Sequence, residues 1–429
     1  MSGIFNIQVI LILLTFGIFI ALMITKKLPT ILALPLLGVL IAAIAGVPFA
    51  HAAEPDGQTI MNFVIGQGSA RLASTMIAII FGGMFAKVIQ KQGISDAIIR
   101  KAAELAGDKP YAIAFVLTAA TTLVFSAISG AGPVIMVSAI AIPLMLSTGI
   151  QPVVAASLVL FGISTGGLFN VANYQFYVDT IGMDLSIIKS TSVVLGLASV
   201  VAIVAYVLIH VRKGASKSFW AKPVAAPTKD VGVLALLAPL VPILLVFLFH
   251  CTAEVSLLVA VLYTVLVTKP REIIQICSSA LVEGIQDVAG VIALMIGIGI
   301  LLNGVSAQAT VALMQPLIGA IMPKNAVVYV IAFTILSPLA LYRGPLNSYG
   351  LGSGLANIML AAGTMNPAAI GNALRATGVV QGVSDPTNTQ NVIVADYAKV
   401  DVNAILKSTL PYTMFVTLVA LIYTGVVFF

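Results

Sequence analysis

A succession of long apolar stretches, separated by short polar loops, is the feature that most limits how this chain can fold. They cover Val9–Thr25, Thr30–Ala50, Ser74–Ile89, Tyr111–Ser129, Ser192–His210, Val231–His250, Val255–Val267, Val288–Gly304, Ala326–Leu341 and Leu410–Phe428. A helix needs about 20 apolar residues to cross the hydrocarbon core of a bilayer. Because unpaired backbone groups are excluded from lipid, the pattern predicts an all-α polytopic membrane protein with about 10–12 membrane segments.

Composition and charge support this class of protein. Of 429 residues, 60% are hydrophobic and only 8% are charged, whereas soluble domains are about 25% charged. The net charge of +6 comes from Lys and Arg in short loops, so nucleic acid is not an expected partner. The positive-inside rule places Lys26–Lys27, Lys87–Lys109 and Arg212–Lys229 in the cytoplasm and the acidic segment His51–Gln58 outside. We therefore expect a multi-pass protein of a bacterial-type cytoplasmic (inner) membrane, with both termini outside.

The two halves of the chain contain similar motifs in the same order. The matched pairs are Phe125–Pro133 with Leu336–Pro345, Gly162–Gln175 with Gly378–Gln390, and Asp184–Thr191 with Asp401–Thr409. The loop charges give equivalent segments opposite orientations, which is an inverted-topology repeat with broken or re-entrant hairpin helices. This predicts a first repeat at 1–214, a cytoplasmic linker at 215–230 and a second repeat at 231–429.

Helix-breaking residues interrupt the apolar segments at repeat-related positions. Such breaks form substrate and ion sites in many carriers, since the freed backbone groups need polar partners. The expected substrate-binding residues are Ser129, Gly130, Gly132, Asn170, Asn173, Arg343, Gly344, Asn347 and Arg375. The expected cation-coupling residues are Gly166, Ser384, Asp385, Thr387, Asn388 and Thr389. For Asn170 and Asn173, capping of a local unwound turn is the alternative.

Two arginines in apolar surroundings, Arg343 and Arg375, suggest an anionic substrate. A charge at the bilayer centre costs at least about 2.5–3.5 kcal/mol and is normally functional, and a guanidinium matches a carboxylate with two parallel hydrogen bonds. The alternative is that Asp385 neutralises one arginine. Asp385 could instead carry a coupling proton or, with Asn388, bind Na⁺; no other cofactor is expected. Glu283 and Asp287 are predicted to begin a helix near Gly284, where acidic residues favour the helix dipole.

Three stretches of the first half resemble a known family. ALMITKKLPTILAL (Ala21–Leu34), FAKVIQKQGISDAIIRKAAELAGDKP (Phe85–Pro110) and VSAIAIPLMLSTGIQPVVAASLVL (Val137–Leu160) are similar to the citrate–metal symporter family of the ion transporter superfamily. The resemblance implies two inverted repeats and carboxylate import driven by protons or Na⁺. The family's acidic residue is missing from the first hairpin, SAISGAGPV (Ser126–Val134), so only the organic-anion class is carried over. Gluconate-type and dicarboxylate carriers remain equally open.

These features together predict a secondary transporter that moves a small organic anion, such as a di- or tricarboxylate or a sugar acid, by H⁺ or Na⁺ symport. A cation/proton antiporter on the same scaffold is the alternative, with Asp385 and Asp287 as its acids. A channel would need a ring of like charges, and an intramembrane enzyme would need a catalytic constellation that the sequence lacks. By analogy with such carriers, the protein is expected to be a homodimer in the lipid bilayer.

Overall fold

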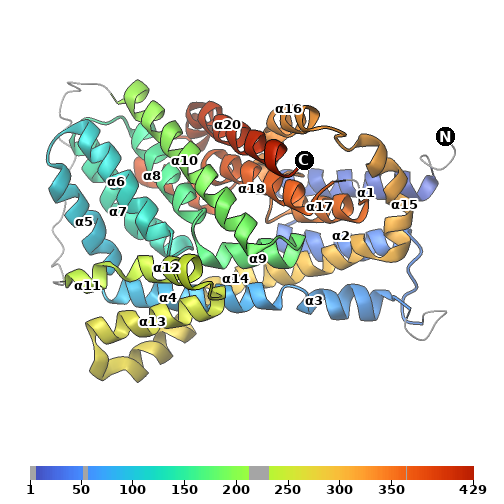
Figure 1. The fold of residues 1–429 in the computed structure, drawn as a ribbon, viewed down its shortest axis with the longest axis horizontal. Coiled ribbons are helices and arrows are strands. Elements are labelled where there is room, and N and C mark those ends of the chain that lie inside the picture. Colours follow the sequence, from blue (N-terminus) through green and yellow to red (C-terminus); the bar gives the residue numbers. More distant parts are fainter. Residues whose placement is uncertain (1–5, 52–56, 212–230, 364) are drawn as a thin grey trace.

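The protein is helical throughout the part of the chain that the computed structural model describes, residues 6–51, 57–211, 231–363 and 365–429 (Figure 1). The first half comprises α1 Ile7–Ile24, α2 Thr30–Ile44, the π-helical η1 Ile60–Gln67, α3 Gly68–Ala70, α4 Ala73–Lys91, α5 Ile94–Ala106, α6 Pro110–Phe125, α7 Ala131–Ser147, α8 Pro152–Gly167, α9 Val171–Ile181 and α10 Leu185–His210. The second half comprises α11 Val233–Leu236, η2 Ala238–Leu240, α12 Val241–Phe249, α13 Ala253–Thr268, η3 Pro270–Glu272, α14 Ile273–Ser306, α15 Gln308–Ile321, α16 Ala326–Leu336, η4 Ser337–Arg343, α17 Leu351–Ala361, α18 Pro367–Ser384, α19 Thr389–Ala398 and α20 Val402–Val427.

The predicted all-α membrane class is confirmed. Within the described ranges, six helices are long and apolar enough to cross a membrane, or up to seven if the bent pair α8–α9 counts as one span. The other predicted segments are shorter apolar helices. Prolines explain one of them: Pro239 and Pro242 divide the predicted segment Val231–His250 into α11, η2 and α12, because proline cannot donate into the helical ladder.

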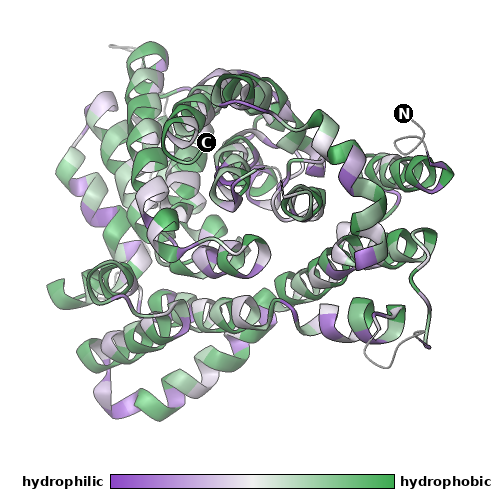
Figure 2. Cartoon of the chain, turned by 45° about the vertical axis from the view of Figure 1, so that its right-hand side comes forward, coloured by the Kyte–Doolittle hydropathy of each residue, from purple (hydrophilic) through white to green (hydrophobic). Residues whose placement is uncertain are grey.

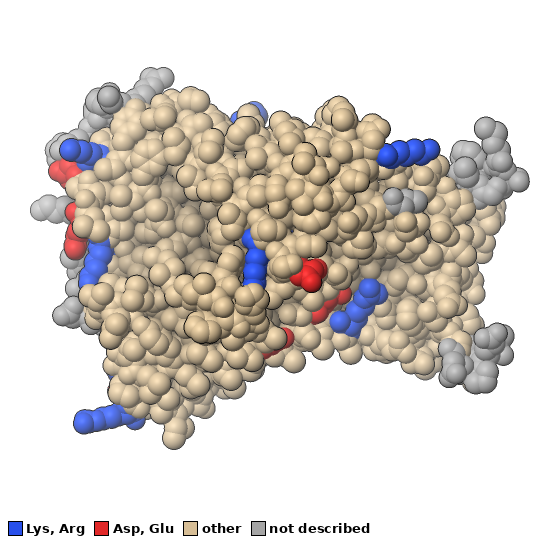
Figure 3. Space-filling view, viewed as in Figure 1, with Lys and Arg blue, Asp and Glu red and all other residues tan. Residues whose placement is uncertain are grey.

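The outer surface of the molecule is unusually apolar. Hydrophobic residues cover most outward-facing helices in Figure 2, and Figure 3 shows only scattered charged side chains on a face that is otherwise uncharged. Large aliphatic side chains such as Leu14, Leu197 and Leu248 are exposed on α1, α10 and α12. Apolar patches of this extent would drive aggregation in water, so this surface is suited to lipid.

Helix α14 forms the long axis of a scaffold and packs along α2, α3 and α4 (Figure 1). Glycines make the close approaches: a Cβ on Gly304 would lie 2.2 Å from the Gly38 carbonyl oxygen. A Cβ on Gly284 would lie 2.6 Å from the Met84 amide nitrogen. Small residues let helix backbones approach closely in membrane proteins. The scaffold therefore depends on glycine at these crossings.

The two halves contain corresponding elements in the same order. In each, an interrupted helix pair (α8–α9 or α18–α19) leads to an aspartate that caps a 26-residue helix, α10 or α20. Asp184 accepts a hydrogen bond from the Ser186 amide, and Asp401 accepts one from the Asn403 amide. Packing is crosswise, since α7 contacts α19, α17 contacts α9, and α10 contacts α20. The opposite membrane orientation of the halves stays a prediction, and linker 215–230 lies outside the described residues.

Candidate functional site

The first helix break separates α8 from α9 and bends the pair by 61°. The Asn170 side chain caps α9 by accepting a hydrogen bond from the Ala172 amide at 3.1 Å, and it donates to the Phe125 carbonyl at 3.4 Å. Asn173 donates to the Gly167 carbonyl at 3.0 Å. Both asparagines therefore form hydrogen bonds to backbone groups at and beside the break, and their contact with a substrate stays a prediction. Gly166 supports the same region, because a Cβ there would lie 2.5 Å from the Thr122 carbonyl oxygen of α6.

The second break, between α18 and α19, is organised by Asp385, which is almost fully buried. Its Oδ1 accepts hydrogen bonds from the Tyr342 amide at 3.0 Å and from the Thr387 amide and hydroxyl at 2.9 and 2.8 Å. These three hydrogen bonds hold the carboxyl group of Asp385 in place at the break. No arginine lies within ion-pair distance among the described residues, so Asp385 neutralises neither Arg343 nor Arg375.

The other predicted cation-coupling residues do not converge on Asp385. Ser384 lies 2.8 Å from the Thr409 hydroxyl and faces α20. The Asn388 side chain donates to the Gln381 carbonyl at 3.4 Å, and Thr389 is the first residue of α19. The described residues contain no group of three or more His, Cys, Asp or Glu side chains that could hold a metal ion. A Na⁺ site here would therefore depend on Asp385 and on carbonyl or amide oxygens.

The segment after η4 holds Arg343 in an uncommon backbone conformation. Tyr342 and Arg343 both have positive φ, 54° and 57°, a region that costs non-glycine residues about 1–3 kcal/mol each and often marks functional sites. Gly344 follows, and a Cβ there would lie 2.2 Å from the Leu339 carbonyl oxygen. Arg343 is half-buried and makes no hydrogen bond or ion pair with any described residue. Its guanidinium is free to meet a ligand.

This segment also contacts the first break. The Tyr349 hydroxyl donates to Asn173 Oδ1 at 3.1 Å, which joins the start of α17 to α9. The buried Asn347 donates to the Ala340 carbonyl at 3.3 Å, while its Oδ1 has no partner among the described residues. Tyr349, which the sequence did not single out, therefore joins the segment between η4 and α17 to the break between α8 and α9.

Arg375 lies in the interior, on α18. Its guanidinium donates to the Ile188 carbonyl at 2.9 Å and to the hydroxyls of Thr191 and Ser192 on α10, and it lies 5.5 Å from the centre of the Tyr177 ring. All of these partners are uncharged. The side chain thus joins the two halves and keeps a positive charge that no described carboxylate neutralises.

A third arginine, Arg71, was missed by the sequence analysis. It lies in the turn between α3 and α4 and donates to Asn303 at 2.8 Å and Ser306 at 3.0 Å on α14, and to Asn357 at 2.9 Å on α17. Asn357 in turn donates to the Thr180 carbonyl of α9 at 2.9 Å. The available signal was a lone charge in the stretch GQGSARLAS, whose Gly and Ser residues looked like an external loop.

Asp179 on α9 was also missed. Its carboxylate accepts hydrogen bonds from the Thr75 amide at 2.9 Å and hydroxyl at 2.7 Å, and from Gln175 at 2.8 Å. It therefore caps the beginning of α4, where the helix dipole favours negative charge. Asp179 stands five positions before Asp184, as Asp396 stands five before Asp401, so the repeat could have identified it. Arg71 and Asp179 together attach the scaffold to α9 and α17.

The first hairpin turn, between α6 and α7, lies beside an ion pair between α4 and α14. Ser129 and Gly130 are exposed, and a Cβ on Gly132 would lie 3.8 Å from Asp287 Oδ2. Asp287 pairs with Lys87 at 2.7 Å, and Glu283 pairs with Lys91. The prediction that Glu283 and Asp287 begin a helix is wrong, because α14 starts at Ile273. Both acids lie well inside α14 and bind α4.

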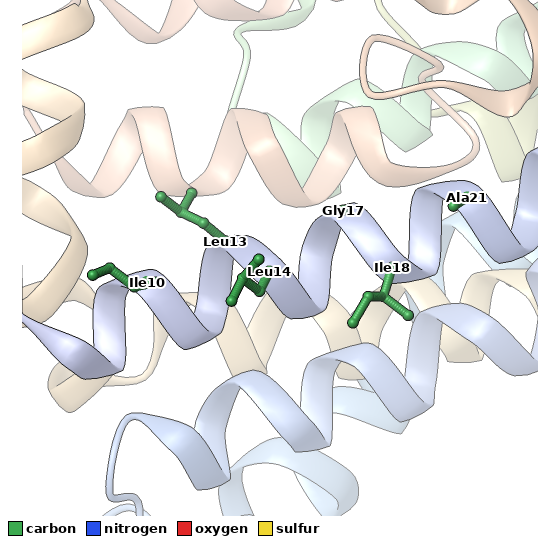
Figure 4. A pocket seen from close by; sticks show the side chains of 6 residues that line it. All are labelled: Ile10, Leu13, Leu14, Gly17, Ile18 and Ala21. Atoms are coloured by element: carbon green, nitrogen blue, oxygen red, sulfur yellow. The ribbon is translucent and has the colours of Figure 1, made fainter.

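A groove of about 440 Å³ on α1 is a poor candidate for a transport site (Figure 4). It is lined only by Ile10, Leu13, Leu14, Gly17, Ile18 and Ala21. Binding sites for small solutes contain a few polar groups that fix the orientation of the ligand, and this groove has no polar side chain. It belongs to the lipid-suited surface.

Comparison with known proteins identifies the fold. No family model and no curated protein matches the sequence. The structure is similar to the YdaH transporter of Alcanivorax borkumensis, with a TM-score of 0.62 and 13% identity over 92% of this chain and 97% of that chain. It is also similar to MtrF of Neisseria gonorrhoeae, from a class of antimetabolite efflux pumps, with a TM-score of 0.60 and 13% identity over 95% of each chain. This chain has the fold of these membrane transporters. The narrower resemblance to citrate–metal symporters stays a prediction.

Proposed function

We propose that this chain is a secondary transporter that couples the movement of a small organic anion to H⁺ or Na⁺ by alternating access. The observation that carries the proposal is a set of three arginines, of which Arg375 is buried and Arg71 and Arg343 are half-buried. No carboxylate of the described residues pairs with Arg71, Arg343 or Arg375. The ion pairs within the described ranges are all formed by lysines. Unneutralised guanidinium groups attract carboxylates, which they bind with paired hydrogen bonds.

Arg343 is the residue expected to contact the substrate most directly. The guanidinium groups of Arg71 and Arg375 donate hydrogen bonds to neutral side chains or backbone carbonyls. The guanidinium group of Arg343 donates none to the described residues. Its neighbour Tyr342 is bonded through its amide to Asp385. A substrate bound to Arg343 and a cation bound to Oδ2 of Asp385 would therefore both contact the backbone segment Tyr342–Arg343 or its hydrogen-bond partner. This proximity would couple substrate binding to cation binding.

MtrF belongs to a class of efflux pumps, whereas the sequence resemblance implies import, so transport is to be measured in both directions. Purified protein in liposomes would be tested with labelled mono-, di- and tricarboxylates. Na⁺ and proton gradients would be imposed separately and in both directions. Gradient-dependent movement of one acid would support the proposal and identify the coupling ion.

The same assay contains the result that would overturn the proposal. If no carboxylate moves and a Na⁺ gradient instead drives proton flux, the chain is a cation/proton antiporter. Asp179 and Asp385 favour keeping this second candidate, since neither carboxylate pairs with a cationic side chain among the described residues. Asp385→Asn would then abolish the cation-driven proton flux, while Arg343→Lys would leave it unchanged.

A further inference from the structure

A second cavity, of about 450 Å³, lies where the beginning of α10 meets the end of α12. Its lining residues are Asp184, Leu185, Ser186, Lys189, Ser190, Val193, Phe247 and His250. The volume falls within the usual range for small-molecule sites, about 300–1,000 Å³. Unlike the groove on α1, this cavity combines charged, hydroxyl and aromatic side chains, so it can orient a polar ligand.

Two opposite charges in this cavity do not pair with each other. Asp184 accepts hydrogen bonds from the Ser186 amide and hydroxyl through Oδ1, and its Oδ2 accepts none from the described residues. These Ser186 bonds lower the pKa of Asp184, so the carboxylate is charged at neutral pH. The Lys189 ammonium lies 5.7 Å from the centre of the Phe247 ring and has no carboxylate within ion-pair distance among the described residues. Each charge is therefore available to a ligand.

On the side that follows α10 and α12 away from Asp184, the cavity is bordered by exposed apolar side chains. Val193 and Leu197 continue from it along the exposed side of α10, and Leu244 and Leu248 are exposed on α12. A ligand whose charged end lies in the cavity can place its hydrocarbon chains in van der Waals contact with these exposed side chains. A soluble ion would gain nothing from this part of the surface.

We infer that this cavity binds the headgroup of a phospholipid that carries a primary amine, such as phosphatidylethanolamine. The phosphate meets the Lys189 ammonium, and the lipid ammonium donates to Asp184 Oδ2. The acyl chains lie along Val193 and Leu197. Phosphatidylcholine has no N–H group to donate to Asp184, and phosphatidylglycerol has no cation to pair with it. The inference is independent of the transported substrate.

Lipid binding would be measured by native mass spectrometry of the full chain in detergent, titrated with phosphatidylethanolamine, phosphatidylcholine or phosphatidylglycerol of identical acyl chains. We expect the first lipid to bind most tightly. Lys189→Gln and Asp184→Asn should each weaken its binding about threefold to fivefold, the effect of losing one partly exposed ion pair. Asn still caps the helix, so the second variant removes the charge and keeps the fold.

Two controls separate this site from general effects. Lys189→Arg keeps the charge and should bind as the wild type does. Lys407→Gln changes the repeat-related lysine, which is exposed on α20 outside the cavity, and should leave binding unchanged. Equal binding of the three lipids, unchanged binding in Lys189→Gln and Asp184→Asn, or equal loss in Lys407→Gln would overturn the inference. So would competition by soluble phosphoethanolamine at the same concentration as the lipid.

Discussion

Replacing Arg71 with lysine tests whether this side chain joins the scaffold to α9 and α17. The guanidinium makes three hydrogen bonds, to Asn303, Ser306 and Asn357, at 2.8–3.0 Å. A lysine ammonium keeps the charge, but its compact head cannot span acceptors on two helices, so about two of these bonds are lost. Hydrogen bonds in membrane proteins contribute about 0.6 kcal/mol on average and up to about 1.7. Arg71→Lys should therefore lower the free energy of unfolding by about 1–3 kcal/mol.

The measurement is reversible unfolding in mixed detergent micelles, with helicity followed as the fraction of denaturing detergent rises. Arg271→Lys is the matched control, because Arg271 is exposed in η3 and makes no hydrogen bond with the described residues. A double-mutant cycle of Arg71→Lys with Asn357→Ala isolates the contact to α17, and we expect the two losses to be less than additive. An unfolding free energy equal to that of the wild type would refute the assignment of Arg71 as a joint between these elements.

Three further predictions concern the substrate, the scaffold and its ion pairs. Arg343→Lys should raise the half-saturating substrate concentration at least about tenfold, because a point charge loses paired hydrogen bonds worth about 1.5–3 kcal/mol; near-native affinity in the flux assay would remove Arg343 from the site. Gly304→Ala should destabilise the protein by about 1–3 kcal/mol through overpacking against Gly38, measured by the same unfolding assay; an unchanged free energy would contradict the close approach. Lys87→Asp should destabilise the protein, and adding Asp287→Lys should restore up to about 1 kcal/mol; a double variant no more stable than Lys87→Asp would show that the pair contributes nothing.

Hydropathy predicted the apolar elements well because burial in lipid imposes a simple composition on a helix. The predicted segment Val9–Thr25 corresponds to α1, Ile7–Ile24, and the predicted segment Leu410–Phe428 covers the C-terminal part of α20, which ends at Val427. Helix α5 was not predicted, since it is amphipathic and has no long apolar run. The start of α14 was misjudged for a related reason: its first turns are too polar to extend the apolar stretch.

The candidate site was only partly predictable. A lone charge in an apolar setting identified Arg343 and Arg375, but sequence could not show that Arg375 bonds Ile188, Thr191 and Ser192, more than 180 positions earlier. Such contacts depend on how the two halves pack. Arg71 was not predicted as a buried site residue, because the stretch around it is rich in small and polar residues, which also occur in external loops. In the fold, the same residues form a turn between two helices against α14.

The length of α14 has a mechanical consequence. At 34 residues the helix is about 51 Å long, against a hydrocarbon core of about 30 Å, so it must tilt strongly or extend beyond the core. The glycine crossings at Gly38, Gly83 and Gly68 are spaced along it and act as fixed points, since a small sliding movement would drive backbone into backbone. α2, α4 and α14 therefore form a rigid frame. In the alternating-access mechanism proposed above, we expect α9 and α17 to move relative to this frame at the hydrogen bonds between Asp179 and Thr75 of α4 and between Arg71 and Asn357 of α17.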